Sequence, residues 1–171
     1  MATKSFSDLM LAMRAFQQSR VLLTAVELDV FSAVGGGAIA AEVAVKRNTN
    51  PRATEMLLNA LVAVGALTKN GSTFHNTPET LRYVCADSPE NMQPGLMHIV
   101  HLWQTWSTLS DAVRAGTSVA SPGTEAHDQQ WTQAFIAAMH NNAKTMAAPF
   151  VELVSARKVH RLLDVGGGSG A

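Results

Sequence analysis

The sequence predicts a mainly helical protein with one small β-hairpin, followed by the first strand of an α/β domain. Three observations carry this prediction. Apolar residues recur at three- and four-residue steps over most of the 171 residues, as on one face of a helix. The dipeptide Asn70-Gly71, typical of a tight hairpin turn, separates two short strand-like runs. Near the carboxyl end, a glycine-rich segment follows an apolar run, as where a buried strand turns into a helix.

Composition and charge exclude several classes of protein. Hydrophobic residues make up 47% of the chain, enough for a substantial core. The 13 Lys and Arg residues equal the 13 Asp and Glu residues, so no net charge draws the molecule to nucleic acid or anionic lipid. A single cysteine, Cys85, excludes an internal disulfide framework. No secretion signal or membrane-spanning run is evident, so we expect a soluble, cytoplasmic protein that does not bind membranes.

Two helical stretches are expected at the amino end. Ser5 and Asp8 match a helix-starting pattern, and apolar residues from Phe6 to Phe16 follow at helical spacing. The run from Val21 to Val34 is apolar on more than one face, and the glycines that follow it should end the helix. A helix that is apolar all round needs a packing partner.

The middle of the chain has the order helix, turn, helix, hairpin, which is typical of a winged helix. Asn50 is expected to cap the second of these helices, with Pro51 at its first position and Gly65 at its end. The expected elements are helices over 40–45 and 51–64, strands over 66–69 and 72–75, and a further helix from Thr77-Pro78-Glu79.

The remainder is expected to be helical, with interruptions. We predict a loop over 87–94, helices over 96–115 and 128–155 separated by the Gly- and Pro-containing segment 116–123, and a strand over 159–165. These signals divide the chain into a winged-helix region (1–95), a helical linker (96–158) and the start of an α/β domain (159–171).

The glycine-rich segment is the motif that carries chemistry. Asp164 lies at the end of the expected strand, and Gly166, Gly168 and Gly170 follow it, where missing side chains let the backbone approach a ligand. This arrangement resembles the first S-adenosylmethionine motif of class I methyltransferases. An ordinary strand-to-helix turn and a dinucleotide-binding fingerprint remain alternatives.

The order of all these parts resembles the plant-type S-adenosylmethionine-dependent O-methyltransferase family, which is also common in bacteria. The resemblance spans nearly the whole chain and implies a Rossmann-like cofactor domain. It also implies methyl transfer to a hydroxyl of a small aromatic or polyketide-like molecule, and a homodimer formed through the amino-terminal helices, whose apolar surface runs from Phe6 to Phe31. The cofactor-binding residues that it implies are Asp164, Gly166, Gly167, Gly168 and Gly170.

The same resemblance suggests residues of an acceptor pocket. Trp106, with Leu109, Asp111-Ala112-Val113 and Gly116, is similar to the segment that precedes the pocket in the family. Phe135 and Met139 match a Phe-x-x-x-Met pair that lines it, and their spacing puts both on one helix face. The candidates are Trp103, Trp106, Phe135 and Met139; the alternative is that the last two are simply core residues.

The sequence also departs from the family pattern. The acidic residue about 20 positions beyond the glycines and the family's downstream catalytic histidine are not present. We therefore expect a truncated form that serves as a dimerisation scaffold without activity of its own, and we assign no catalytic residue.

A winged-helix DNA-binding transcriptional regulator is the alternative function. The helix from Pro51 would be its recognition helix and Lys69 would lie on its wing. Arg52 and Glu55 give that helix one cation and one anion, a poor face for phosphates, so no nucleic acid partner is expected. His98 and His101 lie three residues apart without a third ligand at matching spacing, so no metal is expected either.

Overall fold

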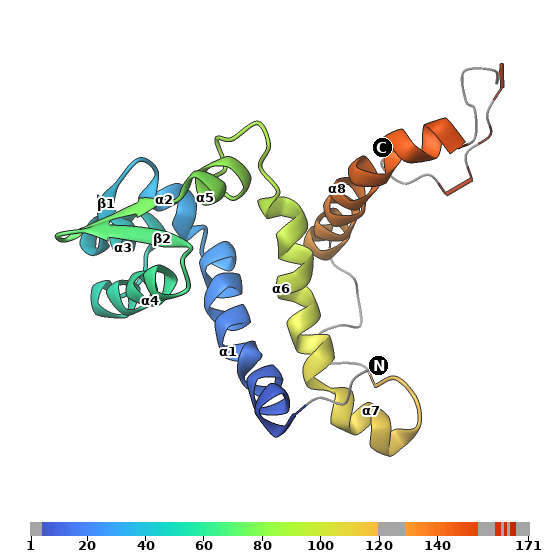
Figure 1. Ribbon diagram of the computed structural model, residues 1–171, viewed down its shortest axis with the longest axis horizontal. Helices are drawn as coiled ribbons and strands as arrows, with labels where there is room; N and C mark the ends of the chain where they lie inside the picture. Colours follow the sequence, from blue (N-terminus) through green and yellow to red (C-terminus); the bar gives the residue numbers. More distant parts are fainter. Residues whose placement is uncertain (1–4, 120–128, 154–159, 162, 164, 167–171) are drawn as a thin grey trace. The chain divides into compact units, whose positions relative to one another are not determined.

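The computed structural model describes residues 5–119, 129–153, 160, 161, 163, 165 and 166. The chain divides into two compact units, Met1–Gln93 (unit 1) and Pro94–Ala171 (unit 2). Figure 1 shows their helices and strands. The division falls close to the boundary at residue 95 that the sequence suggests.

Unit 1 is a helical unit with a three-stranded antiparallel sheet. Its strands are β1 (Ala38–Ile39), β2 (Leu67–Asn70) and β3 (Thr73–Asn76), in the order β1-β3-β2. Its helices are α1 (Phe6–Glu27), α2 (Val30–Val34), α3 (Ala40–Arg47), α4 (Pro51–Ala63) and α5 (Pro78–Tyr83). The helix, turn, helix, hairpin order of α3, α4, β2 and β3 confirms the predicted mainly helical fold with a winged helix.

Local capping signals fix where these helices begin. Ser5 and Asp8 form a reciprocal capping box at the start of α1. The side chain of Asn50 accepts a hydrogen bond from the Ala53 amide (3.0 Å) at the start of α4. Gly71 adopts a φ of +57° in the β2–β3 turn, a conformation that glycine adopts without steric cost. Each of these features was predicted from residue type alone.

The helix boundaries at the amino end differ from the prediction. Residues 6–16 and 21–34 were expected to form two helices, but α1 runs continuously to Glu27 because the intervening polar residues do not break a helix. The break comes instead at Asp29, which adopts a φ of +49°. Its carboxylate lies 2.6 Å from the Arg47 guanidinium, an ion pair that holds this turn against α3.

The core of unit 1 lies between the helices and the sheet. The fully buried large side chains are Phe74, Leu58, Leu61, Leu67, Val30, Val34 and Val43. Asn76 is buried among them, and its amide donates to the Phe31 and Gly35 carbonyls, both at 2.9 Å. The sheet is thereby tied to α2 by polar contacts as well as by apolar packing.

Strand β1 was not predicted. It has only two residues, Ala38 and Ile39, which pair with Phe74 and Thr73. Gly37 precedes it with a φ of +155°, and a Cβ built on Gly37 would lie 2.7 Å from the His75 ring. The His75 ring nitrogen Nδ1 in turn lies 3.0 Å from the Gly36 carbonyl oxygen. A two-residue strand leaves no periodic signal, so only this three-dimensional contact defines it.

Unit 2 contains α7 (Leu109–Ala115), α8 (Gln129–Leu153) and all but the first residue of α6 (Gln93–Ser107). The single helix predicted over 96–115 is interrupted at Thr108, whose hydroxyl donates to the Thr105 carbonyl. Pro149 lies inside α8. The predicted strand over 159–165 falls partly outside the described residues, and the described ones show no β-pairing.

Candidate functional site

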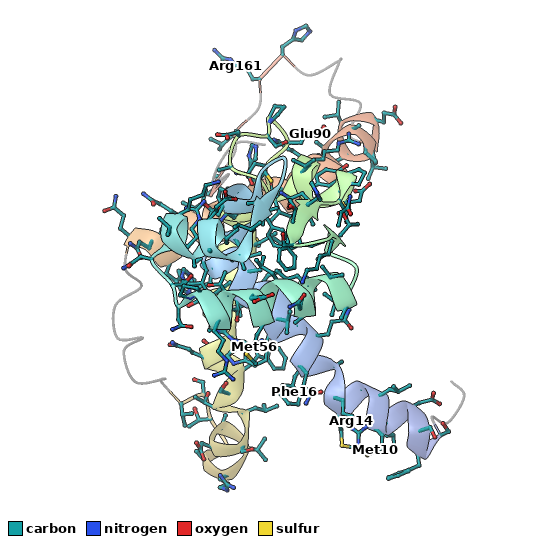
Figure 2. The ribbon with its side chains drawn as sticks, turned by 90° about the vertical axis from the view of Figure 1, so that its left-hand side faces the viewer. Met10, Arg14, Phe16, Met56, Glu90 and Arg161 are labelled. Atoms are coloured by element: carbon teal, nitrogen blue, oxygen red, sulfur yellow. The ribbon has the colours of Figure 1, made fainter. Side chains whose placement is uncertain are left out.

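The first candidate site is the amino-terminal half of α1, which exposes a row of large apolar side chains. Phe6 is 75% exposed and Phe16 is 55% exposed. Figure 2 shows Met10, Arg14 and Phe16 on this part of the helix. Leu9, Leu11 and Met13 are also exposed. Exposed apolar side chains gathered on one helix are typical of a surface that binds another protein.

The predicted dimer surface is shorter than the sequence suggested. It was expected to run from Phe6 to Phe31, but Val26, Val30 and Phe31 are buried in the core of unit 1. Periodicity does not distinguish these two roles, because a helix uses the same apolar spacing for a core and for an interface. The part available to a partner chain is residues 6–16, and we call it the α1 face.

The second candidate site is a cluster of aromatic rings in unit 2. The Trp131 and Phe135 rings of α8 stack with centroids 5.4 Å apart. His98 of α6 meets both rings nearly edge to face, at 5.7 Å from Trp131 and 5.3 Å from Phe135. We call His98, Trp131 and Phe135 the ring cluster. Of the four predicted pocket residues, Phe135 is the one that these ring contacts include.

The other three predicted pocket residues are placed differently. Trp106 is 68% exposed on α6, and Met139 is partly exposed one turn beyond Phe135 on α8. Trp103 lies on α6, one turn before Trp106. Their role in binding an acceptor stays a prediction. Sequence reasoning missed Trp131, although its spacing of four residues from Phe135 indicates that the two rings share a helix face.

His98 has an unusual environment for a histidine. Burial, followed by the neighbouring His101, lowers the pKa of the His98 imidazole below its ordinary value. The Nδ1 atoms of His98 and His101 are both buried and have no hydrogen-bond partner among the described residues. Within the described part of the chain, no group of three metal-ligating side chains is found.

Most of the predicted cofactor motif lies outside the described residues. Asp164, Gly167, Gly168 and Gly170 cannot be placed, and Gly166 alone is described. Gly166 adopts a φ of +80°, a conformation that favours glycine and fits a turn whose backbone approaches a ligand. The assignment of these five residues to S-adenosylmethionine therefore stays a prediction.

Lys69, which lies on the wing of the winged helix, contacts other residues of unit 1. The Lys69 ammonium lies 2.9 Å from the Asn59 side-chain oxygen and 3.9 Å from the Glu55 carboxylate. It also lies 4.5 Å from the centre of the Phe74 ring. These contacts hold Lys69 against α4 and β3.

Comparison with known proteins places these features in a family. Residues 10–84 match the model of the O-methyltransferase dimerisation domain. The tetracenomycin polyketide synthesis 8-O-methyl transferase TcmO of Streptomyces glaucescens is 31% identical over 117 residues, covering 64% of this chain and 33% of that protein. Acetylserotonin O-methyltransferase of Mus musculus is 30% identical over 123 residues, covering 67% of this chain and 32% of that protein.

Solved structures show the same relationship over a longer stretch. An O-methyltransferase family protein from Burkholderia thailandensis matches with a TM-score of 0.83 and 30% identity, covering 99% of this chain and 52% of that one. PigF with SAH (S-adenosylhomocysteine) matches with a TM-score of 0.82 and 25% identity, covering 98% and 53%.

The chain spans about a third of the length of the curated relatives and about half of these solved structures. Among the described residues, no helix has the length and hydrophobicity to cross a bilayer. The match over residues 10–84, the relatives and the shared fold together show that the chain carries the O-methyltransferase dimerisation domain and is similar to O-methyltransferases over nearly its whole length.

Proposed function

We propose that the protein is part of an S-adenosylmethionine-dependent O-methyltransferase whose unit 1 joins two identical subunits. The observation that carries this proposal is the α1 face. Its exposed apolar side chains lie at the start of a unit whose residues 10–84 match a dimerisation domain. A second copy of the chain would remove these side chains from water, which is the main driving force for stable subunit association.

The proposed substrate is a hydroxyl group on a small aromatic or polyketide-like molecule. Two named relatives support this class, since one is a polyketide synthesis 8-O-methyl transferase and the other methylates acetylserotonin. In unit 2, the flat surface of Trp131 and Phe135 is chemically suited to an aromatic ring. S-adenosylmethionine would supply the methyl group, with Asp164, Gly166, Gly167, Gly168 and Gly170 as the residues proposed to hold it.

The winged helix is proposed to serve subunit packing, with no nucleic acid as partner. The internal contacts of Lys69 and the net charge of zero support this assignment. A basic recognition face would be needed for the regulator alternative, and α4 contributes one exposed cation, Arg52, to its surface.

Sedimentation velocity tests the dimer. The unmodified chain is expected to sediment as a dimer at micromolar concentration, and Phe16→Asp is expected to weaken dimerisation by tenfold or more, roughly the effect of losing one central apolar contact. Val45→Asp is the matched control, because Val45 is 82% exposed on α3, away from the α1 face. A monomeric unmodified chain, or equal weakening by both variants, would contradict the proposal.

Calorimetric titration of S-adenosylhomocysteine into the full-length protein tests the cofactor assignment. Gly166→Val is expected to weaken binding by about tenfold or more, because a β-branched residue is strained at the φ that Gly166 adopts. Gly36→Ala is the control, since a Cβ at Gly36 meets no atom within 4 Å. Unchanged affinity in Gly166→Val would remove this residue from the proposed site.

A further inference from the structure

The contact between α6 and α8 in unit 2 includes a close approach of the two helices and a set of ring contacts. Gly95 of α6 lies so close to α8 that a Cβ at this position would sit 3.1 Å from the Ala138 Cα atom. One turn further along α6, His98 meets the Trp131 and Phe135 rings. His98 thus contributes aromatic contacts to the pairing of these two helices.

The paired segments contain no carboxylate, lysine or arginine. Helix α6 has none of these residues, and α8 has none over residues 129–143. The titratable groups of the two segments are His98 and His101 on α6 and His140 on α8. When His98 takes up a proton, no acidic side chain of either segment compensates the new charge.

The position of its Nδ1 atom makes protonation of His98 costly. A neutral imidazole can carry its hydrogen on Nε2 and leave Nδ1 bare, but an imidazolium has a hydrogen on both nitrogens. Because the His98 Nδ1 atom is buried and lacks a partner among the described residues, a new N–H group there would be buried without an acceptor. The lowered pKa of His98 agrees with this arrangement.

We infer that α6 and α8 form a pH-sensitive pair, which holds while His98 is neutral and separates when acid protonates it. The direction in which the stability of the pair changes with pH follows from proton uptake. In the unfolded or separated state, a histidine has its ordinary pKa of about 6.5. Below that pH, this state therefore binds more protons than the paired state. The pairing is therefore fully stable above this value and weakens as the pH falls. This device belongs to unit 2 and does not depend on the proposed dimer of unit 1.

Hydrogen exchange measured by mass spectrometry tests this inference on the whole chain. After correction for intrinsic exchange, protection of residues 131–139 is expected to fall about tenfold or more between about pH 7.5 and pH 5, the effect of burying unpaired donors. Segments of α4 serve as an internal control and are expected to keep their protection. The variant His98→Gln is expected to lose most of the pH dependence, whereas His160→Gln, which changes an exposed histidine, is expected to keep it.

Titration of the His98 ring by NMR gives an independent readout in the unmodified protein. A midpoint below the ordinary histidine value supports the inference. A midpoint above it would mean that attraction between imidazolium and the ring faces dominates, and would overturn it. Unchanged protection of α8 at low pH, a parallel loss in α4, or full pH dependence in His98→Gln would each overturn the inference as well.

Discussion

Unit 1 and unit 2 bury their apolar residues to very different degrees. Among the described residues, Val100 and Ala134 are the buried apolar side chains of unit 2, and all the others belong to unit 1. Unit 2 instead exposes Trp106, Met146, Phe150 and Leu153. Unit 1 therefore has the features of a domain that folds by itself, whereas the helices of unit 2 keep large apolar surfaces for further contacts.

The largest expected effect comes from the core of unit 1. Leu58→Ala should lower the free energy of unfolding by about 2–5 kcal/mol, because Leu58 is fully buried and its truncation leaves a cavity. Met56→Ala on the same helix should change it by less than about 0.5 kcal/mol, because Met56 is 64% exposed. Urea unfolding followed by circular dichroism measures both. Similar losses of unfolding free energy in the two variants would show that Leu58 is not part of a packed core in unit 1.

A buried polar group of unit 1 should give the next largest effect. Asn76→Leu removes the two hydrogen bonds to the Phe31 and Gly35 carbonyls and is expected to cost about 1–3 kcal/mol. Thr68→Ala, which changes an exposed side chain on strand β2, is the control. Urea unfolding followed by circular dichroism measures the free energy of unfolding of both variants. A stability equal to that of the control would mean that apolar packing alone joins the sheet to α2.

Substitution of Gly95 tests the close approach of α6 and α8 in unit 2. Gly95→Ala should weaken the α6–α8 contact by about 1–3 kcal/mol through overpacking, offset by up to about 1 kcal/mol of improved helix propensity. All three tryptophans of the chain lie in unit 2, so tryptophan fluorescence during unfolding follows this unit selectively. A gain in stability of about 1 kcal/mol, as improved helix propensity alone would give, would indicate that α8 moves aside without losing stability.

The smallest effect is expected at the surface of unit 1. The Arg82 guanidinium holds the Glu90 carboxyl with two hydrogen bonds and lowers the pKa of Glu90. This pair stabilises the fold above the ordinary carboxyl pKa, and the contribution is lost as the pH falls through the lowered value. Arg82→Gln should raise the Glu90 pKa toward its usual range in an NMR titration. Arg114→Gln, which breaks an exposed pair with Asp111, should leave Glu90 unchanged.

The sequence predicted best where a single residue type controls the backbone. Ser5, Asn50 and Thr77 cap helices as expected, and Asn70-Gly71 forms the hairpin turn. It failed at Asp29, where a non-glycine residue adopts positive φ because an ion pair from another helix holds the turn. The ring cluster was only partly predicted, since His98 and Trp131 come together through packing between helices, which one helix's periodicity does not encode.

The burial of Cys85 makes its thiol a reporter of how often this part of unit 1 opens. Its thiol contacts the Phe31 carbonyl and the Asn76 amide, and burial raises its pKa, so the reactive thiolate is scarce in the folded state. Because it is the only thiol of the chain, alkylation would attach one label per molecule, at a rate set by how often this region opens. Together with the tryptophans, Cys85 provides each unit with its own natural reporter.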